Sequence, residues 1–377
     1  MPFEVPSSWV WCKLHDIIQI TNGRSQKYVE NVNGKYPIYG SGGIIGKAVD
    51  YLCEAGSTII GRKGTINNPL FVEERFWNID TAFGMKPMYA ISDLYFFYFC
   101  QYFDFSKLDK STAVPSLTQS AIGEVFIPIP PINEQKRITD GISYWLGFID
   151  TLESNLINLQ LAIKQTKSKI LNLAIHGKLV PQDPTDEPAA ELLKRINPKA
   201  EITSDNGHYQ KLPEGWCECC FDDIFNIKMG QSPNGSSINH QQGVEFHQGK
   251  ILFGDKYLKQ SDMFTDAPTK LATPNSLLLC VRAPVGVVNI TQREICIGRG
   301  LCSLKPNAAI NLDYAYHALT TYQSDFESKS TGSTFKAISG SIIRNEVFAL
   351  PPLQEQYRIV TKIEDIFAQL DAIEASL

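Results

Sequence analysis

The sequence predicts an α+β protein with two mixed α/β domains, separated by long helices that pair as an antiparallel coiled coil. Two observations carry this prediction: related segments occur twice along the 377-residue chain, and a heptad pattern follows each copy. A chain of this length is too long for one ordinary core. Its composition, with 43% hydrophobic and 20% charged residues, is typical of a globular protein.

The domain starts and a central strand are repeated. Residues 9–23, which begin with a tryptophan and end with a glycine, are echoed at the same spacing by residues 216–230. Residues 56–62 form an apolar run that ends in arginine, and residues 275–282 do the same. Both runs are typical of buried strands followed by a turn. We therefore expect two copies of one domain framework.

The domain ends are repeated as well. Residues 130–135 read Pro-Pro-Ile-Asn-Glu-Gln, and residues 351–356 read Pro-Pro-Leu-Gln-Glu-Gln. A proline pair cannot lie inside a helix, whereas Glu-Gln suits a first helical turn. Each motif therefore predicts the end of a strand and the start of a helix.

The two predicted helices carry matching apolar seams, with steps that alternate between four and three residues. This spacing is typical of a coiled coil. The alternative is that each seam packs only on its own domain. The first seam contains Ile138, Ile142, Trp145, Ile149, Leu152, Leu156, Leu159 and Ile163, and the second contains Ile359, Ile363, Ile366, Leu370 and Ile373.

The second helix is the shorter one. Antiparallel pairing would therefore leave part of the first seam open to a second copy or to another subunit. The chain thus divides into a first domain (1–132), a helical spacer (133–177), a linker with a short helix near 189–196 (178–211), a second domain (212–352) and a final helix (353–377).

Sequence motifs for catalysis are missing. The glycine-rich stretch 40–48 departs from the phosphate-binding loop in its spacing and in ending with Ala48. The nine cysteines lack metal-ligand spacing, so we expect reduced thiols and no metal site. Without a signal peptide or a membrane-spanning run, we expect a soluble cytoplasmic protein. The net charge of −5 requires any nucleic-acid-binding surface to be local.

The order of these motifs, including the tail Gly-Lys-Leu-Val-Pro-Gln-Asp at 177–183, resembles the specificity (HsdS) subunits of type I restriction-modification systems over essentially the whole chain. The resemblance implies two target recognition domains, each reading half of a split DNA sequence. The helices would set the spacing and dock methyltransferase subunits, with restriction subunits as possible further partners. The chain itself would not be an enzyme: S-adenosylmethionine, ATP and Mg²⁺ would act in the partner subunits.

Reading base edges and phosphates needs basic and polar side chains on loops that can enter a groove. In the first domain we expect DNA contacts from Arg24, Lys27, Tyr39, Ser41, Lys47, Arg62, Lys63 and Lys110. In the second domain we expect them from Ser232, Asn234, Lys256, Lys259, Arg282, Ser333 and Lys336. The alternative is a non-catalytic coiled-coil scaffold that binds only proteins.

Overall fold

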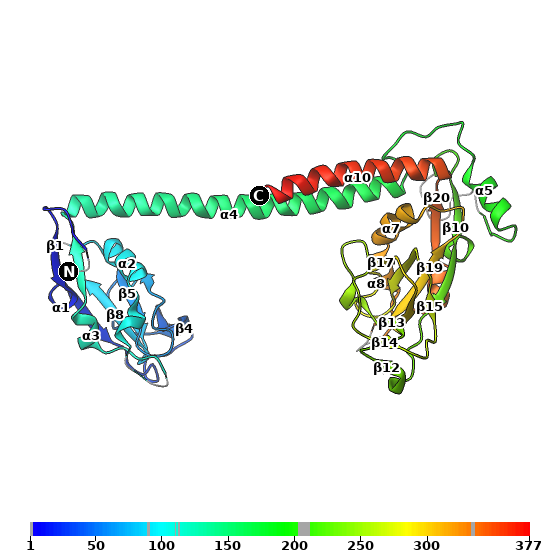
Figure 1. The fold of residues 1–377 in the computed structure, drawn as a ribbon. Helices are drawn as coiled ribbons and strands as arrows, with labels where there is room; N and C mark the ends of the chain where they lie inside the picture. The colour runs from blue at the N-terminus through cyan, green and yellow to red at the C-terminus, as the bar shows by residue number, and fades with distance from the viewer. Residues whose placement is uncertain (1–2, 89–90, 110, 112–113, 203–211, 333–335) are drawn as a thin grey trace. The chain divides into compact units, whose positions relative to one another are not determined.

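The computed structural model describes residues 3–88, 91–109, 111, 114–202, 212–332 and 336–377 (Figure 1). The chain forms two compact units, unit 1 (Met1–Ser154) and unit 2 (Asn155–Leu377). The long helix α4 (Ile132–Ile175) belongs to both, because the boundary between the units falls inside it. The predicted α+β fold with a linking helix is confirmed.

Unit 1 is built on a four-stranded antiparallel sheet, β2-β8-β5-β6, and a three-stranded sheet, β4-β3-β7, with a separate pair β1-β9. The strands are β1 (Val10–Lys13), β2 (Ile18–Asn22), β3 (Tyr36–Gly40), β4 (Gly43–Ala48), β5 (Ser57–Gly61), β6 (Leu70–Val72), β7 (Trp77–Asn78), β8 (Ala82–Pro87) and β9 (Phe126–Ile129). The short helices are α1 (Leu14–Ile17), α2 (Asp93–Tyr102), the 3-10 helix η1 (Phe105–Leu108) and α3 (Gln119–Gly123).

Unit 2 repeats this plan with sheets β11-β19-β16-β17 and β12-β14-β13-β18-β15 and the pair β10-β20. Its strands are β10 (Cys217–Cys220), β11 (Phe225–Met229), β12 (Ile238–Asn239), β13 (Val244–His247), β14 (Phe264–Thr265), β15 (Leu271–Ala272), β16 (Ser276–Cys280), β17 (Val288–Thr291), β18 (Ile295–Ile297), β19 (Leu301–Pro306) and β20 (Val347–Leu350). Its helices are α5 (Ala189–Ile196), α6 (Phe221–Ile224), η2 (Gly235–Ser237), η3 (Lys250–Leu252), α7 (Leu312–Thr321), α8 (Gln323–Lys329), α9 (Gly340–Arg344) and α10 (Leu353–Ala375).

The strand register shows which residues of the two units correspond. Thr58 pairs with Met85 in unit 1, and Leu277 pairs with Leu304 in unit 2. The same number of positions separates Thr58 from Leu277 and Met85 from Leu304, so one constant offset relates the residues of the two units. With this offset Arg62 corresponds to Val281, and Lys63 corresponds to Arg282. The sequence comparison, which matched the two arginines, is therefore wrong by one residue.

The Pro-Pro-x-x-Glu-Gln motif has a structural role in each unit. Gln356 is fully buried, accepts a hydrogen bond from the backbone N–H of Asn311 (2.7 Å), and donates to the carbonyls of Ala309 and Pro351 (both 3.0 Å). Asn311 is the N-cap residue of α7. Gln135 forms the equivalent bond with the N-cap residue of α2, Ser92 (2.8 Å). The glutamine thus ties the start of the long helix to the start of a domain helix.

In unit 2, the C-terminal half of α4 and the helix α10 lie side by side and run antiparallel (Figure 1). Lys167 of α4 pairs with Asp371 and, at 3.5 Å, with Glu374. Ile163, Ile359 and Ile363 are buried, Ile366 and Leu370 are half-buried, and Ile373 is exposed. The helix α4 ends at Ile175 and is followed by Gly177, whose φ of 62° is left-handed; Lys178 N–H is bonded to Leu173 O (2.9 Å).

The predicted seam is not closed over its whole length. Ile138 and Ile142 are half-buried, whereas five residues further along α4 are between 38% and 61% exposed: Trp145, Ile149, Leu152, Leu156 and Leu159. The partner helix α10 ends at Ala375, and its last ion pairs with α4 join Asp371 and Glu374 to Lys167. These exposures agree with the expectation that antiparallel pairing with the shorter helix leaves part of the first seam open.

None of the nine cysteines forms a disulfide bond. Among the helices that the structure describes, none is both long and apolar enough to span a lipid bilayer.

Candidate nucleic-acid interface

Three loops of unit 1 meet at one short segment, Asn78–Thr81. The carbonyl of Asn78 accepts from Arg24 N–H (2.9 Å), the N–H of Ile79 donates to Tyr39 O (2.9 Å), and the carbonyl of Thr81 accepts from Arg62 N–H (2.7 Å). The buried amide of Asn78 also donates to the carbonyls of Thr21 and Ala82. We call this arrangement the unit 1 junction; it brings together the loops after β2, β3 and β5.

Most of the expected DNA contacts of unit 1 lie on these loops. Arg24, Lys27 and Lys63 are exposed, and Ser41 lies against Gly61. Lys63 also forms an isolated β-bridge with Ser116, so the segment around Ser116 is a fourth part of the chain at the junction. Polar and cationic groups on adjoining loops are the arrangement that groove and phosphate contacts require.

Three other expected residues of unit 1 have different surroundings. Tyr39 is half-buried, and its ring packs edge-on against Phe76 at 5.4 Å. Its burial raises the pKa of the phenol. Arg62 lies 5.9 Å over the ring of Phe83, so it is partly held by the core. Lys47 is exposed on β4.

Unit 2 contains the same junction at Ile297–Gly300. Gln231 N–H donates to Ile297 O (2.9 Å), Gly298 N–H to His247 O (2.7 Å), and Val281 N–H to Gly300 O (3.0 Å). These bonds correspond to those of the unit 1 junction. Arg282 bridges to Ala337, as Lys63 bridges to Ser116. The framework is therefore repeated at the level of individual hydrogen bonds, while the exposed side chains differ.

The expected contacts Ser232, Asn234, Arg282 and Lys336 lie on or beside this unit 2 junction. The Ser232 hydroxyl accepts from the N–H of Arg299 (3.4 Å), and Asn234 caps η2. Arg282 and Lys336 are exposed on adjacent segments, joined by Ala283 N–H and Lys336 O at 3.2 Å.

A partly buried ion pair fixes the loop that carries Lys259. Arg293 donates to Glu245 (2.6 Å) and to the carbonyl of Lys259 (2.8 Å), and Ser261 N–H donates to Glu245 (2.6 Å). Burial alone would raise the pKa of Glu245, but the hydrogen bonds from Arg293, Ser261 and His247 together lower it to about 2. The side chain of Lys259 is exposed, while its carbonyl is held by Arg293.

Lys256 does not belong with the expected DNA contacts. Its ammonium group pairs with Asp313 (2.9 Å) and Glu364 (3.2 Å), and only 24% of its side chain is exposed. The carboxylates raise its pKa although burial opposes them. Lys256 therefore holds α10 to α7. Lys110 and Ser333 lie outside the described residues.

Sequence reasoning missed Arg299, an exposed cation inside the unit 2 junction. It lies between Gly298 and Gly300, both of which supply backbone hydrogen bonds to the neighbouring loops. The flanking glycines were the available signal. Because its unit 1 counterpart is Asp80, the two junctions present opposite charges at this point.

Among the described residues, no group of three His, Cys, Asp or Glu side chains is placed to hold a metal ion.

The family model for the type I restriction modification DNA specificity domain matches residues 6–161 and 213–377. The chain is 30% identical over 285 residues to the specificity subunit of the MjaX type I restriction enzyme proposed for Methanocaldococcus jannaschii, covering 73% of this chain and 61% of that protein. It is also 30% identical over 283 residues to the EcoEI specificity subunit of Escherichia coli, covering 64% and 46%. The chain thus spans less than two thirds of the length of these two relatives.

Two solved structures share the fold. The HsdS subunit from Thermoanaerobacter tengcongensis aligns with a TM-score of 0.63 at 21% identity, covering 100% of this chain and 93% of that one. A chain from a study of complex assembly in the type I R-M system aligns with a TM-score of 0.67 at 22% identity, covering 100% and 94%. With a family match over both repeats, this chain belongs to the type I restriction-modification specificity subunit family.

Proposed function

We propose that this chain is the DNA specificity subunit of a type I restriction-modification complex and that it reads a two-part target. The observation that supports this most is the repeated junction: one framework holds different exposed side chains in each unit. A protein that reads two unlike half-sites needs constant backbone support and variable groups at the surface. Unit 1 would read one half-site and unit 2 the other.

We further propose that the chain contributes no catalytic group and requires no cofactor of its own. S-adenosylmethionine, ATP and Mg²⁺ would be bound by methyltransferase and restriction subunits that dock on it. This proposal rests on the family and on the absence of recognisable catalytic sequence motifs.

The test is adenine methylation of a random-sequence DNA library by the chain together with its methyltransferase subunit. We expect a split motif that depends on this chain. The matched variants Lys63→Ala and Arg282→Ala occupy equivalent positions in the two units, so each should relax or weaken only one half of the motif. Equal loss across all sequences would make these residues phosphate contacts. Methylation that ignores the chain would favour the protein-binding scaffold.

A further inference from the structure

The unit 1 junction contains a β-turn at residues 79–82. The turn is closed by a hydrogen bond from the N–H of Ala82 to the carbonyl of Ile79 (3.0 Å). A side chain on Gly23 would come within 1.8 Å of that same carbonyl, so the loop after β2 packs against the turn at a residue without a side chain. The two central residues of a β-turn do not take part in the closing bond. Asp80, the first of them, is therefore held through its neighbours while its side chain is exposed.

Unit 2 contains the same turn at residues 298–301. The N–H of Leu301 donates to the carbonyl of Gly298 (3.0 Å), and a side chain on Gly230 would come within 2.2 Å of this carbonyl. Arg299 occupies the position of Asp80 and is exposed as well. The backbone support of this position is thus constant, whereas its side chain changes from a carboxylate to a guanidinium. The turn itself does not require either side chain.

The carboxylate of Asp80 is not engaged by its own domain. Among the residues that the structure describes, it accepts no hydrogen bond and forms no ion pair. Arg62 lies close by, but its guanidinium donates to the backbone carbonyl of Asp80 (3.4 Å) and lies over the ring of Phe83. An exposed charge on a supported turn, engaged by no neighbour, is available to a ligand.

Cationic segments adjoin the turn at both of its ends. Arg24 N–H donates to Asn78 O (2.9 Å), Lys63 N–H donates to Thr81 O (3.3 Å), and both cationic side chains are exposed. Cations suit phosphates, whereas a carboxylate is repelled by them. The groups of DNA that a carboxylate can approach favourably are the amino groups of bases, which in the major groove are cytosine N4 and adenine N6. Asp80 is therefore suited to a base edge between phosphate contacts.

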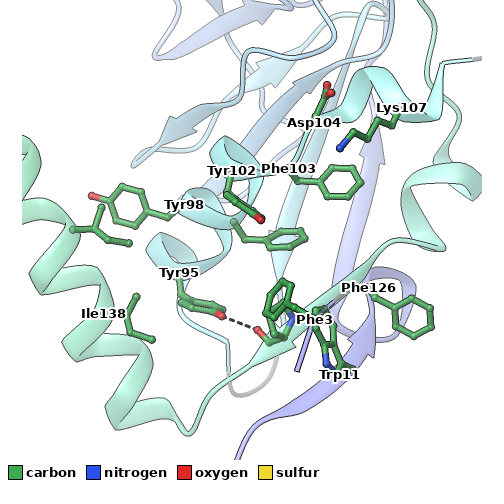
Figure 2. Close-up of a pocket in the computed structure, with 13 residues that line it drawn as sticks. Phe3, Trp11, Tyr95, Tyr98, Tyr102, Phe103, Asp104, Lys107, Phe126 and Ile138 are labelled. Carbon is green, nitrogen blue, oxygen red and sulfur yellow. Dashed lines mark hydrogen bonds between the residues drawn. The ribbon is translucent and has the colours of Figure 1, made fainter. Parts of the chain in front are cut away.

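The pocket of about 670 Å³ between α2, the pair β1-β9 and the start of α4 is separate from this surface (Figure 2). Its lining is mainly aromatic, with Phe3, Trp11, Tyr98 and Phe126 among the residues, and none of the lining residues belongs to the junction. Base edges are recognised mainly by hydrogen-bonding side chains. The junction, and not this pocket, supplies such groups.

We infer that Asp80 is a specificity-determining residue of unit 1, which accepts a hydrogen bond from the amino group of a cytosine or an adenine in the major groove. The inference rests on the proposed function, because it requires unit 1 to read DNA. It adds the assignment of one base pair to one side chain. It also gives a negative charge a role in specificity: on any other sequence the carboxylate repels the phosphates without gaining the compensating hydrogen bond.

The test maps adenine methylation of a random-sequence library by the parent chain and by Asp80→Ala, each together with the methyltransferase subunit. We expect one base pair, in one half of the motif, to lose its preference by about tenfold or more, while the other half stays as in the parent. Because a repelling charge is removed, the affinity of the complex for an unrelated duplex should rise, roughly two- to fivefold at low salt. Fluorescence anisotropy measures this affinity, and thermal melting verifies that the variant folds.

A second variant distinguishes the two bases. Asparagine pairs with N6 and N7 of adenine. Asp80→Asn should therefore move the preference to adenine if the parent reads cytosine, and should keep it if the parent reads adenine. The matched control Glu73→Ala removes another exposed carboxylate of unit 1, just after β6, and should leave every position of the motif unchanged.

The outcomes separate this inference from the proposed function. If the parent chain directs a split motif and Asp80→Ala changes no position of it, the inference is overturned and the proposed function stands. An even loss at all positions, or equal changes with Glu73→Ala, would likewise overturn the inference, because the carboxylate would then act only through general charge. Methylation that does not depend on the parent chain would remove the proposed function itself, and this is measured before any variant is made.

Discussion

His317 is buried on α7 in a way that makes unit 2 sensitive to acid. Its side chain lies edge-on to Phe367 at 6.0 Å, and its Nε2 atom has no hydrogen-bond partner among the described residues. Burial lowers the pKa of His317 to about 4, and the nearby Lys256 lowers it further while Asp313 opposes this. Between a pH of about 6.5 and about 4, the unfolded chain therefore binds a proton that the folded chain does not.

Stability should consequently fall as the pH drops through this window. The parent chain should lose part of its free energy of unfolding between about pH 7.5 and about pH 5. We expect His317→Leu to make that loss smaller by roughly 1–2 kcal/mol. Urea unfolding of both proteins at the two pH values measures this. The exposed substitution Gln354→Ala removes no titratable group, so it serves as the control and should leave the pH dependence as it is in the parent chain. An identical pH dependence in all three proteins would contradict the assignment.

Arg299 is the exposed cation in the unit 2 junction, beside the loops of Ser232 and Arg282. If unit 2 reads DNA, Arg299→Ala should lower duplex affinity and reduce the salt slope by about 0.9 for each phosphate that the arginine neutralises. Fluorescence anisotropy of the complex with its methyltransferase subunit, at several salt concentrations, measures both. The variant Lys362→Ala removes an equal charge from the exposed side of α10 and should change neither. Equal effects of the two variants would indicate only a general charge effect.

At the scale of elements, the start of each long helix depends on one glutamine. Gln356 joins α10 to the N-cap of α7 through three buried hydrogen bonds. Gln356→Ala leaves a buried N–H and two carbonyls without partners, so we expect a loss of about 2–4 kcal/mol. Denaturant unfolding measures it. Gln354→Ala, on the same turn but exposed, should change stability by less than about 0.5 kcal/mol. Equal losses would show that helix propensity, and not the buried bonds, sets the effect.

Local signals in the sequence were sufficient for the two long helices and the short linker helix. The heptad spacing, the proline pair and Gly177 predicted a helix over 133–177, and the structure has α4 at Ile132–Ile175. The short linker helix was expected near 189–196, where α5 lies. Such signals are local because helix periodicity and end chemistry depend on neighbouring residues.

The candidate DNA-binding surface depends on contacts that the sequence does not reveal. Lys256 looks like any loop lysine until folding brings Asp313 and Glu364 to it. The equivalence of Lys63 with Arg282 follows from the register of the strands, which is set by their hydrogen bonds. The apolar runs in the sequence leave that register uncertain by one residue. Arg299 becomes a candidate DNA contact only because the segment around it is hydrogen-bonded to three separate parts of the chain.

At the scale of the whole molecule, the negative net charge does not oppose a local DNA-binding surface. Part of the acidity of α10 is neutralised within unit 2, since Asp371 and Glu374 meet Lys167, and Glu364 meets Lys256. The exposed cations of the two junctions have no such partners among the described residues. Charge at the recognition loops is therefore separate from the total charge of the chain.

The two units have separate hydrophobic cores, and this should be visible in unfolding. Each buried cluster draws its residues from one unit; Phe96 is fully buried in unit 1, and Phe348 is 1% exposed in unit 2. Phe96→Ala and Phe348→Ala should each cost about 3–5 kcal/mol. We expect two calorimetric transitions, with each variant lowering only the transition of its own unit.

Tryptophan fluorescence can assign those transitions, because Trp216 is in unit 2 and the other four tryptophans are in unit 1. Phe348→Ala should therefore leave most of the fluorescence change at its original temperature, whereas Phe96→Ala should move it. A single transition lowered by both variants would mean that α4, whose 44 residues belong to both units, couples the two cores into one cooperative structure. In that case a change in one recognition domain would also alter the stability of the other, and the two half-sites could not vary independently.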